Sequence, residues 1–168
     1  MKIFVSGLPR CGKTTLIKKI FESYKDRILI SGFYTEEILN SMNERIGFRI
    51  FSIDLNKEFL FASKLEKSNI KYAGYNLFLE NLEKVLNSIK LDSNLILIDE
   101  IGKMEMLSKR FEEFVFKILN SNINLIATLH RAYFYKFSKY GKVFWLEKAN
   151  WQKIYDEILK IIQNTFLR

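Results

Sequence analysis

Residues 7–14 read Gly-Leu-Pro-Arg-Cys-Gly-Lys-Thr and fit the pattern G-x-x-x-x-G-K-[ST] at every fixed position. The segment follows an apolar run at Ile3–Val5 and precedes apolar residues at helical spacing between Leu16 and Tyr24. Glycines let a backbone approach an anion closely, and a helix start directs the loop's N–H groups at a single point. The sequence therefore predicts a strand, a phosphate-binding loop and a helix, in that order.

Both the amides and the side chains of this loop suit a phosphate ligand. We expect the binding residues to be Gly7, Leu8, Pro9, Arg10, Cys11, Gly12, Lys13, Thr14 and Thr15. Lys13 supplies a positive charge to the terminal phosphates, and the Thr14 hydroxyl binds a Mg²⁺ ion that bridges them. Because Lys13 meets the phosphoryl group that reacts, we also count it as a catalytic residue.

The length and composition predict one globular domain over residues 1–168. Apolar residues make up 48% of the chain and charged residues 27%, and no apolar run approaches the ~18 residues that span a bilayer. The N-terminus lacks the pattern of a secretion signal, so we expect a cytoplasmic protein without a membrane segment. Cys11 is the sole cysteine, which excludes an internal disulfide and favours Mg²⁺ held by oxygen atoms as the metal.

Apolar runs and helical stripes alternate along the chain. Strands are predicted at residues 2–6, 27–35, 45–53, 57–62, 94–98, 124–128 and 142–145, and helical stripes at residues 16–24, 82–89, 107–119 and 154–162. Leu95–Ile98 is apolar without alternation, as in a parallel strand covered on both faces. Three strand signals between residues 27 and 62 follow one another without a helix. We expect an α/β fold with a mostly parallel central sheet flanked by helices, made mixed by antiparallel strands.

Two carboxylates, Asp99 and Glu100, come directly after the buried strand at Leu95–Ile98. An acid in this place holds Mg²⁺ opposite a phosphate-binding loop, and we assign that role to Asp99. We assign Glu100 as the general base that positions and deprotonates a water for attack on the γ-phosphate. The alternative for Glu100 is a solvated carboxylate in a loop or a charge at the start of a helix.

Polar residues also close the next apolar strand, at Thr128, His130 and Arg131. Thr128 or His130 is placed to orient water, and Arg131 to stabilise the charge of the transition state. His130 is the single histidine of the chain, and an isolated histidine also serves in packing or in a surface hydrogen bond. We include His130 and Arg131 among the candidate catalytic residues.

The net charge of +8 raises the question of nucleic-acid binding. Between residues 130 and 145, basic residues alternate with aromatic ones, the arrangement that stacks single-stranded bases. The alternative is a general abundance of lysine and aromatic residues, which gives a solvated face and some core packing. We retain weak nucleic-acid binding by this segment as a hypothesis.

Several segments together resemble one family, the THEP1-type nucleoside-triphosphatases. They are residues 7–15, Gly32-Phe33-Tyr34-Thr35-Glu36-Glu37, Arg45-Ile46-Gly47-Phe48, Asp99-Glu100-Ile101-Gly102-Lys103-Met104-Glu105 and Ala127-Thr128-Leu129-His130-Arg131. The resemblance is ordered and covers nearly the whole chain. It implies a P-loop fold with an extra strand between the two nucleotide motifs, and Mg²⁺-dependent hydrolysis of ATP, GTP and other nucleoside triphosphates. The family pattern assigns Lys13 and Thr14 to phosphate and Mg²⁺, Asp99 to the metal and Glu100 to water.

One place departs from the family pattern, which tends to carry Asn-Arg-Asp near the C-terminus. This chain has Asn150-Trp151-Gln152 there, so a contact made by that arginine is missing or replaced. Trp151 either stacks on a nucleobase or packs the last helix against the core, and packing is the commoner use of an aromatic residue. Glu36, Glu37 and Arg45 match the family without an evident role; they form either an ion-pair cluster near the nucleotide or a polar hairpin.

Hydrolysis of a nucleoside triphosphate is the leading functional hypothesis. A small nucleotide or nucleoside kinase shares the loop and the size, but it needs an acceptor pocket and clustered arginines, and the sequence shows no compact arginine cluster. An RNA-binding switch driven by nucleoside triphosphate is the third hypothesis, and depends on segment 130–145. The sequence makes no prediction of oligomeric state.

Overall fold

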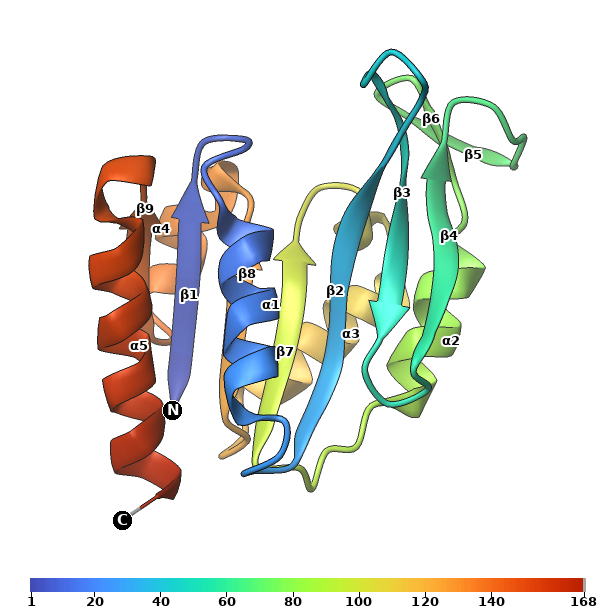
Figure 1. Ribbon diagram of the computed structural model, residues 1–168. Helices are drawn as coiled ribbons and strands as arrows, with labels where there is room; N and C mark the ends of the chain where they lie inside the picture. The colour runs from blue at the N-terminus through green and yellow to red at the C-terminus, as the bar shows by residue number, and fades with distance from the viewer. Residues whose placement is uncertain (168) are drawn as a thin grey trace.

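The computed structural model describes residues 1–167 and contains one nine-stranded mixed sheet with helices on both faces (Figure 1). Across the sheet the strands follow the order β5-β6-β4-β3-β2-β7-β8-β1-β9. The strands are β1 (Lys2–Gly7), β2 (Ile30–Leu39), β3 (Arg45–Ser52), β4 (Lys57–Ser63), β5 (Ile70–Tyr72), β6 (Tyr75–Leu77), β7 (Leu95–Ile101), β8 (Leu125–Leu129) and β9 (Lys142–Leu146). The α-helices are α1 (Lys13–Tyr24), α2 (Leu79–Ser88), α3 (Lys109–Leu119), α4 (Phe134–Ser138) and α5 (Trp151–Phe166), and the 3₁₀ helices are η1 (Glu105–Leu107), η2 (Arg131–Tyr133) and η3 (Lys148–Asn150).

Strands β2, β7, β8, β1 and β9 run parallel to one another. Along β7, Leu95 and Leu97 pack with α1 and α5, whereas Ile96 and Ile98 pack with α2 and α3 on the other face. All four side chains are fully buried, which explains why the run lacks a polar residue. The carboxyl ends of these strands meet at one edge of the sheet, where α1 begins (Figure 1).

Strand β2 joins the parallel strands to an antiparallel extension. It pairs with β7 through Ile30–Phe33 and with β3 through Phe33–Leu39, and β3 then pairs antiparallel with β4. Gly32 has a φ of +123°, and a Cβ there would overlap the carbonyl oxygen of Leu97 on β7. The β2–β3 hairpin rises past the ends of the parallel strands (Figure 1). The predicted mixed α/β sheet is confirmed.

The structure differs from the predicted elements in several places. Strand β7 runs to Ile101, so Asp99 and Glu100 lie within the strand instead of after it, and extended Ser108 divides the helix predicted at residues 107–119 into η1 and α3. Strand β2 begins at Ile30 rather than residue 27, because the turn that ends α1 extends through Ile28, whose N–H donates to the Tyr24 carbonyl at 3.1 Å. The β5–β6 hairpin and α4 were not predicted, since strands of three residues and a helix of five are too short for a clear periodicity. No helix within residues 1–167 is both long and apolar enough to cross a membrane.

Candidate active site

Most of the polar residues predicted from the sequence lie around one cavity at the carboxyl edge of the parallel strands. Its volume is about 640 Å³, within the range of small-ligand sites. The phosphate-binding loop follows β1, Asp99 and Glu100 lie near the end of β7, and His130 follows β8. Strand β8 lies between β1 and β7, as the resemblance implied. The cavity lining includes Gly7, Pro9, Arg10, Gly12, Lys13, Thr14, Thr15, Asp99, Glu100, His130 and Arg131.

The loop itself has the conformation that its glycines allow. Gly12 has a φ of +100°, and a Cβ there would lie 2.9 Å from the Trp151 indole. The indole Nε1–H of Trp151 donates to the Gly12 carbonyl at 3.0 Å. The Lys13 ammonium lies 3.1 Å from the carbonyl oxygens of Gly7 and Leu8, so its charge is held within the curve of the loop. Leu8 is 53% exposed and Cys11 is buried, and neither side chain lines the cavity.

The Trp151 side chain packs against neighbouring side chains of α1 and α5. Its ring stacks on Tyr155, with centroids 5.1 Å apart, and the Lys19 ammonium lies 5.0 Å from its ring. Asn150 is also in structural use, because its side chain bonds to the backbone of Glu147 and Trp145. These contacts favour the packing interpretation of Trp151, with α5 supporting the phosphate-binding loop from behind.

Asp99 is a buried carboxylate, 1% exposed, that accepts hydrogen bonds from three threonines. The Thr14 hydroxyl donates at 2.8 Å, the Thr128 hydroxyl at 2.6 Å, and both the backbone N–H and the hydroxyl of Thr35 at 3.2 Å. Thr128 is fully buried, so its hydroxyl positions Asp99 instead of orienting water in the cavity. Thr35 was missed as a site residue, although the segment from Gly32 to Glu37 matched the family pattern.

Glu100 shares its surroundings with a second carboxylate, that of Glu105 on η1. A Cβ on Gly102 would lie 2.7 Å from Glu100 Oε1 and 2.5 Å from Glu105 Oε2, so both oxygens occupy the space that this glycine leaves open. Burial, followed by the negative charge of Asp99, raises the pKa of Glu100 to about 7, although the charge of Lys13 acts in the opposite direction. Burial, followed by the charge of Glu100, raises the pKa of Glu105 well above its ordinary value. A carboxyl with a pKa near 7 accepts and returns a proton readily at neutral pH.

Glu105 was also missed as a site residue. It lies in the segment Asp99–Glu105 that carried the resemblance, but a glutamate in a loop gives no signal of burial by itself. It is 7% exposed and lines the cavity.

His130 and Arg131 follow β8 and line the cavity beside Lys103. The Ala132 N–H donates to His130 Nδ1 at 3.1 Å, so the neutral ring carries its proton on Nε2. Burial lowers the pKa of His130, and the charges of Lys103, Arg131 and Lys13 lower it further. The side chain is thus suited to donate one hydrogen bond to an anion and is not suited to take a proton from water.

Glu36, Glu37 and Arg45, which the sequence left without a role, lie on the cavity wall as ion pairs. Glu37 accepts from Arg45 Nη1 at 3.1 Å and lies 4.0 Å from Arg10 Nε. Glu36 pairs with the Lys18 ammonium at 2.5 Å. The ion-pair interpretation of these residues therefore describes them better than an isolated polar hairpin.

The basic and aromatic segment at residues 130–145 is in part a packing segment. Phe137 is fully buried, and its ring meets that of Phe4 edge-on at 5.7 Å. Phe144 is also in the core, whereas Tyr135 and Trp145 are 86% and 38% exposed. Nucleic-acid stacking by this segment would use the two exposed rings and stays a prediction.

Comparisons with known proteins identify the family of the chain. A family model described as NTPase (NTPase_1) matches residues 2–159. The nucleoside-triphosphatase THEP1 of Methanocaldococcus jannaschii is 40% identical over 167 residues, covering 96% of this chain and 97% of the relative. That of Archaeoglobus fulgidus is 32% identical over 168 residues, covering 97% of this chain and 99% of the relative.

Solved structures give the same result. The crystal structure of THEP1 from Aquifex aeolicus superposes with a TM-score of 0.82 at 32% identity, over the whole of both chains. The solution structure of a human cancer-related nucleoside triphosphatase superposes with a TM-score of 0.76 at 28% identity, over 98% of each chain. This chain therefore belongs to the THEP1-type nucleoside-triphosphatase family.

Proposed function

We propose that this protein is a Mg²⁺-dependent phosphohydrolase that cleaves the γ-phosphate of ATP, GTP and other nucleoside triphosphates, giving the diphosphate and inorganic phosphate. The observation that carries the proposal is the contact of Thr14 with Asp99, at 2.8 Å, beside Lys13 and Glu100 in one cavity. The relatives and solved structures named as nucleoside triphosphatases support the same activity. The free, buried Cys11 accords with a reducing compartment, and we infer a cytoplasmic location.

The residues present fit a magnesium ion. Mg²⁺ prefers oxygen ligands and is usually bound by one or two carboxylates together with substrate phosphates. The Thr14 hydroxyl and the Asp99 carboxylate are such oxygens, and Thr35 and Thr128 hold the carboxylate in place. When bound, Mg²⁺ neutralises charge on the terminal phosphate oxygens and so favours departure of the diphosphate.

The side chains around the cavity divide the chemistry among them. Lys13 and the loop amides bind the phosphate oxygens, whose negative charge would otherwise repel an attacking water. The water oxygen forms a bond to the γ-phosphorus as the bond to the bridging oxygen breaks, and the water proton passes to the Glu100 carboxylate. Arg131 and the His130 Nε2–H stabilise the negative charge of the transferring group.

This arrangement also gives the nucleotide a direction. The γ-phosphate has to lie by Glu100, at the end of β7, because the attacking water is deprotonated there. The rest of the triphosphate then extends along the loop, away from β7 and toward β9 and α5. We therefore place the nucleoside on the side of the loop where Trp151 supports Gly12.

Phosphate release from ATP, GTP, CTP and UTP tests the proposal. We expect release from each triphosphate with Mg²⁺ present, with the diphosphate as the other product, and almost none after EDTA removes the metal. Release of pyrophosphate, or equal rates with and without divalent metal, would contradict it.

A further inference from the structure

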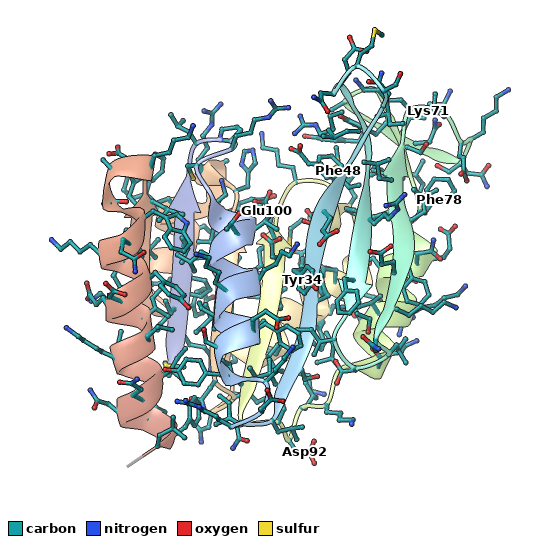
Figure 2. The ribbon with its side chains drawn as sticks, viewed as in Figure 1. Tyr34, Phe48, Lys71, Phe78, Asp92 and Glu100 are labelled. Carbon is teal, nitrogen blue, oxygen red and sulfur yellow. The ribbon has the colours of Figure 1, made fainter. Side chains whose placement is uncertain are left out.

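The cavity extends well beyond the residues that hydrolysis requires. Its outer pocket is formed by Arg45 and Phe48 on β3, Phe61 on β4, and Tyr72 and Ala73 at the β5–β6 hairpin. Figure 2 shows Phe48 on the raised β2–β3 hairpin and Glu100 at the carboxyl edge of the sheet near the start of α1. Glu100 and Glu105 line the same cavity, which is therefore continuous from the phosphate-binding loop to the outer pocket.

The strand order fixes the side on which this pocket opens. Strands β8 and β1, with the loop, lie on one side of β7, and β2, β3 and β4 lie on the other. The nucleoside extends from the loop toward β9 in the proposed function. The outer pocket consequently faces the γ-phosphate from the side opposite the nucleoside, where a second reactant would approach the phosphorus.

Aromatic rings form much of the outer pocket. Phe61 is 1% exposed, whereas Phe48 and Tyr72 are half-buried and offer part of their surface to a ligand. Phe48 is fixed against the Tyr75 ring, with centroids 5.6 Å apart. Aromatic surfaces of this kind stack on nucleobases, and each such contact contributes about 1–3 kcal/mol.

Arg45 adds an anion-binding group that is already oriented. Its Nε–H donates to the Tyr75 hydroxyl at 3.1 Å, its Nη1 donates to Glu37 at 3.1 Å, and its guanidinium carbon lies 5.0 Å from the Phe48 ring centroid. These bonds use two of the five N–H donors of the group. A guanidinium that is fixed in this way is suited to bidentate binding of phosphate.

The fold also brings five basic side chains from separate parts of the sequence to one cavity, which is lined as well by five carboxylates (Glu36, Glu37, Asp99, Glu100 and Glu105). The cavity is lined by Arg10, Lys13, Arg45, Lys103 and Arg131, which come from the loop, β3 and the segments after β7 and β8. Hydrolysis by water requires neither the aromatic pocket nor Arg45. A second ligand with an anionic group and a planar ring would use both.

We propose that the outer pocket binds a nucleoside monophosphate, and that the protein transfers the γ-phosphoryl group to it as well as to water. This inference rests on the proposed function, since it uses the same bound triphosphate. An oxygen of the acceptor phosphate forms a bond to the γ-phosphorus, and the bond between that phosphorus and the bridging oxygen breaks. The donor leaves as a nucleoside diphosphate with the bonding electrons, and the acceptor becomes a second diphosphate. A proton still carried by the acceptor phosphate passes to Glu100.

Transfer of label tests this proposal directly. The full chain is incubated with Mg²⁺ and ATP or GTP labelled at the γ-phosphate, together with AMP, GMP, CMP or UMP, and the labelled products are separated. We expect label in the acceptor diphosphate with at least one monophosphate, and a binding signal for the same monophosphate in the presence of a non-hydrolysable triphosphate.

Two variants of β3 give the matched comparison. Arg45→Ala should lower the ratio of transferred to released phosphate by at least about tenfold, whereas Arg49→Ala, an exposed arginine of the same strand outside the cavity, should keep the parental ratio. Phe48→Leu provides a second variant of the outer pocket, and circular dichroism checks that each variant folds.

The possible failures are distinguishable. Label found only in free phosphate with all four monophosphates would overturn the acceptor proposal and leave hydrolysis standing. If the parent, Arg45→Ala and Phe48→Leu have equal ratios of transferred to released phosphate, the outer pocket is not the acceptor site. Absence of both transfer and phosphate release would instead contradict the proposed function.

Discussion

The Thr14 hydroxyl donates to the Asp99 carboxylate at 2.8 Å, although the two residues are 85 positions apart in the chain. Strand β8 separates β7, which carries Asp99, from β1, which leads into the loop before α1 and Thr14, so the contact depends on the register of the parallel sheet. Thr14 lies in the first turn of α1, and Asp99 lies near the carboxyl end of β7. The contact thereby joins the two halves of the proposed metal site.

Replacing Thr14 tests this junction. Thr14→Ala removes the hydroxyl that we assign to Mg²⁺, so we expect turnover to fall by at least about tenfold and the Mg²⁺ concentration at half-maximal rate to rise. Thr14→Ser keeps the oxygen and should stay close to the parent. A titration of phosphate release against Mg²⁺ makes the comparison, and identical curves for the alanine and serine variants would show that the hydroxyl is dispensable.

Glu105 provides a pH-dependent prediction of stability. Burial and the neighbouring Glu100 and Asp99 raise its pKa in the folded protein above the ordinary value of 4.5. The folded state therefore holds a proton that the unfolded chain releases, and the associated stability, present at low pH, is lost as pH rises through the folded pKa. Glu105→Gln removes this dependence. We expect its free energy of unfolding to exceed that of the parent, with a difference that grows as the pH rises above the ordinary pKa of 4.5.

Urea unfolding at several pH values, without nucleotide or metal, measures this difference. Glu113→Gln, which replaces an exposed carboxylate of α3, serves as the control and should follow the parent. A Glu105→Gln protein that is equally stable or less stable than the parent across the range would mean that the buried carboxylate is fully compensated by its hydrogen bonds.

Trp151 is predicted to stabilise the phosphate-binding loop from α5. Trp151→Phe keeps an aromatic ring but removes the indole N–H that donates to Gly12, which should cost about 0.5–1.5 kcal/mol and weaken triphosphate binding. Trp145→Phe makes the same change of residue type on β9, outside the cavity. Thermal unfolding and triphosphate titration of both variants give the test. If the two substitutions lower stability and triphosphate affinity equally, the Trp151 N–H does not stabilise the loop.

The sequence was sufficient to predict the parallel part of the sheet. The buried run Leu95–Ile98 and the loop at residues 7–14 each have a local pattern with one physical explanation, and both lie where they were predicted. Asp99 and Glu100 lie near the carboxyl end of β7, and His130 and Arg131 follow β8, so their proximity follows from the parallel arrangement of these strands. The THEP1-type resemblance is confirmed by the matching NTPase family model together with the nucleoside-triphosphatase THEP1 relatives.

The remaining site residues depend on contacts that a linear pattern does not encode. Thr35 reaches Asp99 because β2 pairs with β7, and Glu105 enters the site through a 3₁₀ helix of three residues. The outer pocket needs the three-residue strands of the β5–β6 hairpin, which are too short to have a readable period. The sequence of segment 130–145 does not tell buried aromatic residues from exposed ones. Only the packing in the structure shows that Phe137 and Phe144 belong to the core.

The most direct test of the account is single-turnover phosphate release by the parent and by Glu100→Gln, each saturated with Mg²⁺ and ATP. Glutamine keeps the size of the side chain but does not accept the proton from water, so we expect binding of ATP to persist and the rate to fall by roughly 10²–10⁴-fold. Glu113→Gln should retain the parental rate. A Glu100→Gln protein that binds ATP and releases phosphate as fast as the parent would contradict the assignment of Glu100 as the general base.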